Sequence, residues 1–251
     1  MKDKTLKKIF FSAAFLLAIL FLLKFSLAPA LRTYIEIGIG NCRKIPIFCM
    51  APEGKITTGQ VDRNYLTRLL PYAFPKVSLS MPKGFSVVQE KVKKPYYKRN
   101  KRKGSGSIAY VLYEEPGFFV TLFPQLTRTG IKDNYAFLKR TMHARINQIE
   151  NIQDAFFVIM KGIFIPDIGE QSAAKMQQFL VEDKKVFINY NLTKEGNYFD
   201  CNVIDSEGGF FKLYIKDKNA SLGLNEVLTV ISTLKKTTLP PDAAKLLDAE
   251  Q

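Results

Sequence analysis

An apolar run close to the N-terminus constrains this chain more than any other feature of its sequence. Residues 9–23, IFFSAAFLLAILFLL, carry no charge, and residues 1–8 before them hold four lysines and one aspartate. A helix needs about 20 apolar residues to cross about 30 Å of hydrocarbon. The run reaches that length when it is counted through Leu31, with the ammonium group of Lys24 extended to the interface. Residues 9–31 are therefore predicted to be a transmembrane anchor.

The same segment allows other interpretations, each of which exports the rest of the chain. A positive start, an apolar centre and the triplet Ala28-Pro29-Ala30 also fit the three parts of a cleaved signal peptide. A lipid-anchored cysteine is a weaker alternative, because Cys42 lies far from the run. The lysine excess precedes the run, which predicts that residues 1–8 stay in the cytoplasm. The expected localisation is a single-pass membrane protein with an extracytoplasmic C-terminal domain.

The positive charge of the chain is concentrated in one segment. The formal net charge is +14, and residues 91–103, KVKKPYYKRNKRK, hold eight basic residues and no acidic one. Such a segment attracts anionic lipid headgroups or an acidic polymer by about 1 kcal/mol per basic residue, and its tyrosines suit the headgroup layer. The alternative is a solvated loop between two strands. The predicted anionic-surface site comprises Lys91, Lys93, Lys94, Tyr96, Tyr97, Lys98, Arg99, Lys101, Arg102 and Lys103.

The chain has only three cysteines and one histidine, so few side chains could bind a metal ion or form a disulfide. Cys42 and Cys49 are close enough in sequence to close a small disulfide loop in an oxidising compartment. Free thiols or a two-cysteine metal half-site are the alternatives, but His143, the single histidine, is remote in sequence. Cys201 is expected to be a small buried hydrophobe in a strand. No metal and no cofactor are predicted.

The remaining pattern predicts an α+β fold: an N-terminal transmembrane helix followed by one domain with a curved antiparallel sheet packed against helices. Residues 32–78, rich in glycine and proline, are expected to be a connector with a short helix over 61–70. Residues 79–236 form the predicted domain, which contains the basic loop, and residues 237–251 form a loose tail. Strands are expected at 85–90, 107–113, 118–123, 156–165, 175–182, 186–192, 197–204 and 210–216, with helices from Asp133 or Asn134 to Ile149 and over 222–236.

Part of this order resembles the PsbP-like fold family. Met81-Pro82-Lys83-Gly84-Phe85 is similar to the opening strand signal of that family. The meander over 175–216 and the helical segment 225–235 are similar to its closing elements. The resemblance covers about residues 79–236 and implies a curved antiparallel sheet between helices. Members mostly bind or assemble with other proteins, so the resemblance implies interaction rather than a reaction.

No catalytic residue is assigned from the sequence. The motifs G-x-S-x-G and H-E-x-x-H and the phosphate-binding loop are absent, and the acidic pairs Glu114–Glu115 and Asp167–Glu170 fall in predicted turns. The predicted function is a membrane-anchored binding or assembly protein that contacts a protein partner or an anionic envelope surface. Nucleic acid is not an expected partner, because the domain is predicted to be exported. The alternative is an envelope-acting hydrolase or other enzyme with carboxylates on the concave face of the sheet.

Overall fold

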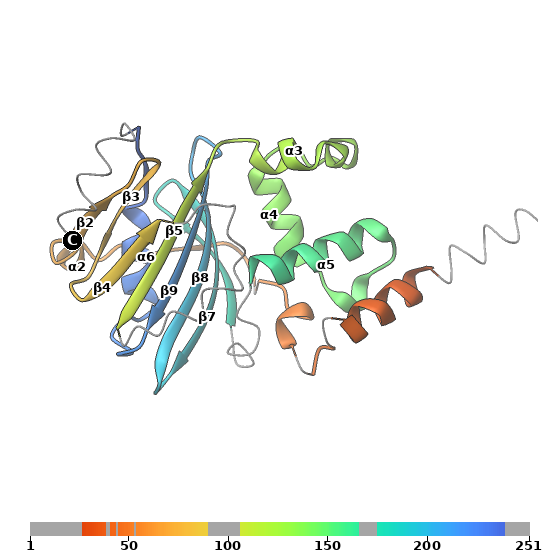
Figure 1. Ribbon diagram of the computed structural model, residues 1–251, viewed down its shortest axis with the longest axis horizontal. Helices are drawn as coiled ribbons and strands as arrows, with labels where there is room; N and C mark the ends of the chain where they lie inside the picture. Colours follow the sequence, from red (N-terminus) through yellow and green to blue (C-terminus); the bar gives the residue numbers. More distant parts are fainter. Residues whose placement is uncertain are drawn as a thin grey trace, which may run out of the picture.

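The computed structural model describes residues 27–38, 41–43, 45–52, 54–89, 106–165 and 175–238. These residues form two halves that lie side by side (Figure 1). The first half, the sheet unit, comprises the described residues of 54–117 and 175–238 and contains every described strand. The second half, the helical unit, comprises the described residues of 27–52 and 118–165.

The main sheet has seven strands in the order β1-β6-β7-β8-β9-β5-β4. Pairing is antiparallel from β6 through β9 to β5, but the two outer pairs, β1–β6 and β4–β5, are parallel. The prediction of an antiparallel sheet is therefore wrong, and the sheet is mixed. Strands β4 and β5 can be parallel because a long connection, rather than a hairpin, joins them. The strands are β1 (Thr57–Thr58), β4 (Phe85–Gln89), β5 (Ser107–Glu114), β6 (Lys175–Val181), β7 (Lys184–Thr193), β8 (Gly196–Ile204) and β9 (Phe210–Asp217).

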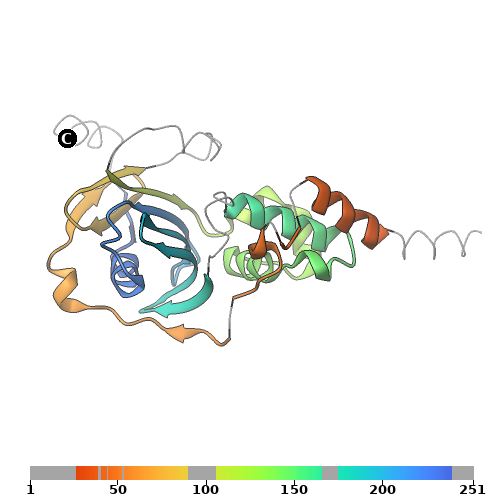
Figure 2. The ribbon, with the colours of Figure 1, turned by 90° about the horizontal axis from the view of Figure 1, so that it is seen from below.

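A second, three-stranded antiparallel sheet completes the sheet unit. It has the order β10-β3-β2, with β2 (Leu70–Ala73), β3 (Val77–Met81) and β10 (Lys235–Lys236). The short helix α2 (Arg63–Leu66) precedes it, so the predicted helix over 61–70 is too long. Both sheets curve around α6 (Leu224–Ser232), which lies in the hollow of the sheet (Figure 2). The apolar stripe of α6 joins one core with side chains of both sheets, as the alternation of the strands predicted.

The helical unit contains two segments that were predicted to be strands. Helix α3 (Phe118–Leu122) lies entirely within the predicted strand 118–123, and residues 156–164 of the other predicted strand form most of α5 (Ile152–Phe164). The predictions failed because both runs are apolar at nearly every position, and such runs show neither period two nor period 3.6. Asp133 accepts a hydrogen bond at the start of α4 (Asn134–His143), as predicted. The 3₁₀ turns are η1 (Pro46–Phe48), η3 (Pro124–Thr129) and η4 (Ile146–Gln148).

The predicted transmembrane helix is not part of the fold as described. No helix among the described residues is both long enough and apolar enough to cross a membrane. Residues 9–26 of the predicted anchor, and the predicted cytoplasmic residues 1–8, lie outside the described residues. Residues 27–31 belong to a helix that continues to residue 38, past the predicted end of the anchor. This helix packs on the helical unit through the buried Ile35 and the half-buried Leu31.

Candidate functional site

The basic segment that carries the predicted anionic-surface site falls outside the structural description. Residues 90–105, with all ten assigned side chains, lie outside the described residues. The acidic residues Asp167 and Glu170 lie outside them as well. The basic segment therefore stays a sequence prediction, and the described residues must supply any further candidate site.

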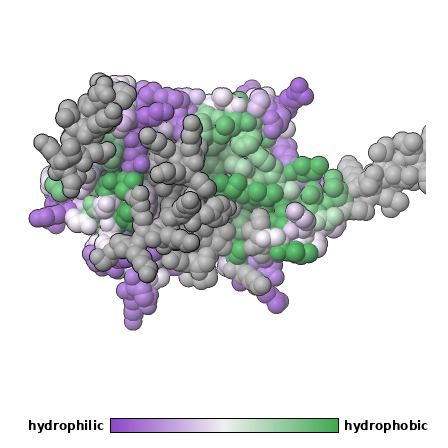
Figure 3. Space-filling model, viewed as in Figure 1, coloured by the Kyte–Doolittle hydropathy of each residue, from purple (hydrophilic) through white to green (hydrophobic). Residues whose placement is uncertain are grey.

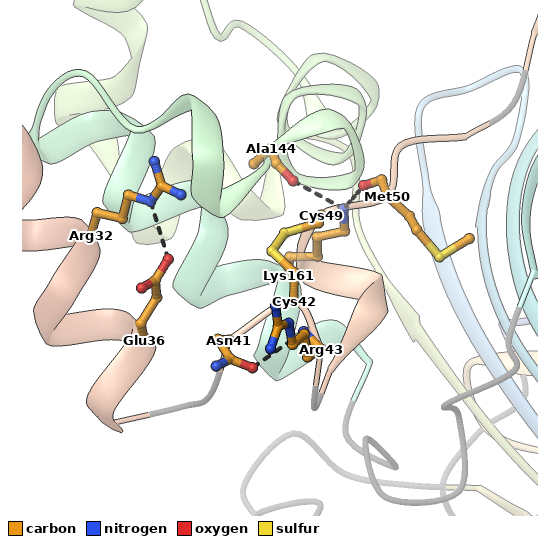
Figure 4. Close-up of a disulfide and its surroundings, with 9 residues drawn as sticks. All are labelled: Arg32, Glu36, Asn41, Cys42, Arg43, Cys49, Met50, Ala144 and Lys161. Atoms are coloured by element: carbon orange, nitrogen blue, oxygen red, sulfur yellow. Dashed lines mark hydrogen bonds and ion pairs between the residues drawn. A yellow bond between two sulfur atoms is a disulfide. The ribbon is translucent and has the colours of Figure 1, made fainter.

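Cys42 and Cys49 are joined by a disulfide at the edge of the helical unit, with their Cα atoms 5.6 Å apart (Figure 4). Phe48, beside the bridge, is fully buried against α5. A Cβ atom on Gly162 would lie 2.9 Å from the Cζ atom of Phe48, so α5 needs glycine at this point. The disulfide loop is therefore docked on α5 rather than free in solution.

Lys161 of α5 makes a further contact with the chain next to the disulfide. Its side chain is fully buried, and Nζ donates to the carbonyl oxygens of Met50 at 2.6 Å and Ala144 at 3.0 Å (Figure 4). Burial, with the nearby Arg145 guanidinium, lowers the pKa of Lys161 to about 7. A neutral amine still has two N–H donors for these two carbonyls. Lys161 therefore connects α4, α5 and the disulfide loop through hydrogen bonds, and no carboxylate of the described residues pairs with it.

A pocket of about 250 Å³ opens beside the end of α4. It contains both signs of charge, and Arg140 pairs with Asp154 at 2.6 Å across it. The half-buried His143 lines it, with Nδ1 2.8 Å from the Lys139 carbonyl oxygen, and burial lowers the pKa of this imidazole. Two arginines and two carboxylates line it, so the pocket presents no excess of one sign to a ligand. Its lining residues are Arg140, His143, Ala144, Arg145, Gln148, Glu150 and Asp154.

A second buried lysine joins the two halves of the molecule. Lys212 of β9 forms a buried ion pair with Asp200 of β8 and donates to the Asn202 side-chain oxygen at 3.0 Å. It also donates to the carbonyl oxygen of Phe164 at 2.6 Å. Phe164 is the last residue of α5, where carbonyl groups lack partners within the helix. Lys212 therefore caps a helix of the other unit from the centre of the sheet.

Among the described residues, hydrophobic side chains rather than paired carboxylates line the concave face of the sheet. Helix α6 fills this face, and the buried side chains around it are hydrophobic, including Phe199, Phe211 and the free Cys201. Burial raises the pKa of the Cys201 thiol, in agreement with its predicted role as a hydrophobe. The exposed carboxylate of Glu115 pairs with Lys236 at the surface. Among the described residues, no group of three or more His, Cys, Asp or Glu side chains is placed to hold a metal ion.

The most unusual surface of the molecule is apolar and belongs to the helical unit. Twelve large hydrophobic side chains are exposed among the described residues, and seven of them belong to this half. Figure 3 shows a broad apolar area over the helices on the face seen in Figure 1. Contiguous apolar patches on a soluble protein mark protein or membrane contacts. We call these seven residues the apolar surface: Leu27, Tyr34, Ile37, Leu122, Ile152, Ile159 and Ile163.

The sequence carries a signal for the apolar surface, but that signal predicts a strand rather than a helix. The run from Phe156 to Ile165 predicted a buried strand, which would use its apolar residues on both faces. As a helix, the same run has more apolar residues than its buried face can hold, so some of them point outward. The buried pair of Lys212 and Asp200 was also missed, because a charged residue in an alternating strand is usually exposed.

Comparison with known proteins gave no relative. No protein-family model, no curated protein and no solved structure matches this chain. None of these comparisons bears on the resemblance to the PsbP-like fold family, which stays a prediction.

Proposed function

We propose that this chain is a membrane-attached, extracytoplasmic protein of the binding or assembly type. Its partner is a protein of the envelope or an anionic envelope surface. The observation that carries the proposal is the apolar surface of the helical unit. This half contains the residues that directly follow the N-terminal apolar run, so the exposed hydrophobic side chains and the proposed attachment belong to the same end of the molecule.

The other features of the described residues support binding rather than catalysis. The buried lysines hold helix ends and loops together through carbonyl oxygens, which is a structural role. The pocket beside α4 is charge-balanced, and the hollow of the sheet is filled by α6. Buried ionisable groups that mark an active site are expected to face an open cleft. Lys161 and Lys212 instead contact backbone carbonyl oxygens, and Lys212 also contacts buried side chains of β8.

Membrane fractionation of the tagged full-length protein tests this proposal. The protein is expected in the membrane pellet after washes with high salt and alkaline carbonate, because an apolar attachment resists both. A matched control replaces Leu16, Leu17 and Ile19 by lysine and is expected in the supernatant, since each charge in an apolar segment costs about 2.5–3.5 kcal/mol. Recovery of the unmodified protein in the supernatant would contradict the proposal. Cross-linking in native membranes followed by mass spectrometry then identifies the partner.

A further inference from the structure

We propose that the apolar surface of the helical unit rests in the headgroup layer of the membrane, so that lipid covers it. This inference rests on the proposed membrane attachment and adds an orientation: the helical unit lies on the bilayer and the sheet unit projects from it. Four observations on the described residues lead to this conclusion.

The first observation is the outer face of α5. Ile152, Ile159 and Ile163 are separated by seven and four residues, so they lie on one side of the helix. Their exposed fractions are 65%, 41% and 45%. The opposite side of α5 is also apolar and is buried in the helical core through Phe157 and Val158. A helix that is apolar on both faces is normally covered on both, and the described part of the chain leaves the outer isoleucines exposed.

The second observation is that other elements of the helical unit also expose large hydrophobic side chains, including a tyrosine. Phe156 of α5 packs edge-to-face on Phe123, with ring centroids 5.1 Å apart, and Leu122 beside it is 52% exposed. The helix over residues 27–38 adds Tyr34 and Ile37, which are 77% and 81% exposed. Tyrosine is enriched where a protein meets lipid headgroups, because one end of its ring is apolar and the other is polar.

The third observation is the distance along the chain from the apolar run. The run ends at Leu23, and the described helix begins at Leu27. Four residues span at most about 14 Å even when fully extended. If residues 9–23 enter the hydrocarbon, as the proposed attachment requires, Leu27 lies within about 14 Å of it. The helix packs on the helical core through Leu31 and Ile35, so the helical unit must stay close to the bilayer.

The fourth observation is the exposed positive charge on the helical unit. Exposed cationic side chains occur on the same unit, and headgroup phosphates attract such groups. An interfacial protein segment inserts about 5–10 Å and combines apolar contact with this attraction. A soluble partner must reach the surface by diffusion, whereas the attachment keeps the bilayer beside it at all times. The exposed cationic residues are Arg43, Arg128, Lys132 and Lys139, together with Arg32 and Arg140, which pair with Glu36 and Asp154.

A single tryptophan tests the proposed contact, because the chain contains none. Ile159→Trp reports on the apolar surface, and Leu192→Trp is the matched control, since these side chains are 41% and 50% exposed. Leu192 pairs with Asn197, at the end of β8 remote from Ile204, which contacts the helical core. Each full-length variant is reconstituted into vesicles of phosphatidylcholine and phosphatidylglycerol, with and without bromine atoms on the upper acyl chain.

The expected result is a blue-shifted emission from Ile159→Trp and a loss of about half its intensity in brominated vesicles, because insertion by about 5–10 Å brings the ring close to the upper acyl chain. Leu192→Trp is expected to show neither change. Tyr34→Trp is a second reporter on the same surface and is expected to behave like Ile159→Trp. Circular dichroism confirms that each variant is folded.

Other outcomes would overturn the inference, and one of them also overturns the proposed function. Emission from Ile159→Trp and Tyr34→Trp that bromine does not quench would show that lipid does not cover this surface. A blue shift without quenching that grows with the protein-to-lipid ratio would assign the surface to a second copy of the chain. Failure of the protein to float with the vesicles would remove the membrane attachment itself.

Discussion

Helix α6 of the sheet unit and helix α5 of the helical unit are both rich in apolar residues, but their surroundings differ. The two sheets surround α6, and Val227, Val230 and Ile231 are completely buried. Helix α5 is covered on one side only, and Ile159 and Ile163 face outward. The sheet unit therefore completes its own core, whereas the helical unit leaves an apolar face for a neighbour. If the proposed membrane contact is correct, the helical unit is the half that makes it.

The two buried lysines differ in a related way. Lys212 has a carboxylate partner in Asp200 and remains an ion pair between the two units. Lys161 contacts two carbonyl oxygens inside the helical unit, and burial lowers its pKa to about 7. Lys212 therefore joins the two units through a charged pair, whereas Lys161 holds the helical unit together through two hydrogen bonds that a neutral amine can also donate. The three predictions below test this comparison.

The largest expected effect is on the contact between the units. Lys212→Met removes the cation from the buried Asp200 and the hydrogen bond to Phe164, and the free energy of unfolding is expected to fall by about 3–5 kcal/mol. Urea unfolding followed by circular dichroism measures the change. Lys236→Met, which removes a surface pair with Glu115, is the control and is expected to behave like the wild type. Wild-type stability in Lys212→Met would mean that the buried pair does not hold the units together.

A smaller and more local effect is expected from the disulfide. Replacing Cys42 and Cys49 by serine opens a loop that spans seven positions and is expected to cost about 2–3 kcal/mol by the loop-entropy estimate. Hydrogen exchange should accelerate at Phe48 and across the helix over residues 27–38. Amides of β8 serve as the internal control and should keep their protection, because the sheet unit has a separate core. Equal acceleration in both units would show that they do not behave independently.

The smallest effect concerns pH and Lys161. The folded pKa of about 7 lies below the ordinary value of 10.5. Between these values the unfolded chain binds a proton that the folded chain has lost, so this lysine makes the free energy of unfolding rise with pH. The increase is at most about 1.4 kcal/mol per pH unit. Below pH 7 both states are protonated and the contribution is constant.

Urea unfolding of the wild type and of Lys161→Met at several pH values between 7 and 9 measures this contribution. The wild type is expected to gain stability relative to the variant as the pH rises. Burial also raises the pKa of Cys201, so its thiol lowers stability when the unfolded thiol ionises. That contribution is common to both proteins and cancels in the difference. A constant difference across the range would show that Lys161 keeps its proton in the folded chain.

The sequence was a reliable guide where local pattern determined structure. The three meander strands from Lys175 to Ile204, the strand at Phe210 and the final helix were all predicted within a few residues. Tight turns join consecutive antiparallel strands, and one alternating face packs on α6, so each element carries its own signal. The prediction that Cys201 is buried is confirmed for the same reason.

The sequence was a poor guide where structure depended on distant residues. The sequence predicts strands where the structure has helices α3 and α5, because these apolar runs show neither helical nor strand periodicity. The parallel pairing of β1 with β6 joins residues more than a hundred positions apart, which no local pattern records. The role of Lys212 depends on a carbonyl oxygen 48 positions away. The apolar surface was missed because it requires α5 to be a helix.

The parallel pairing of β4 with β5 also limits how the basic segment can vary. Phe85 pairs with Ser107 and Gln89 with Val111, so the chain leaves β4 at one end and must enter β5 at the other. A tight turn cannot make this return, because parallel neighbours need a connection of about a dozen residues or more. Charges within residues 90–106 can therefore change with little effect on this pairing, but a deletion that leaves only a few of these residues would separate the two strands.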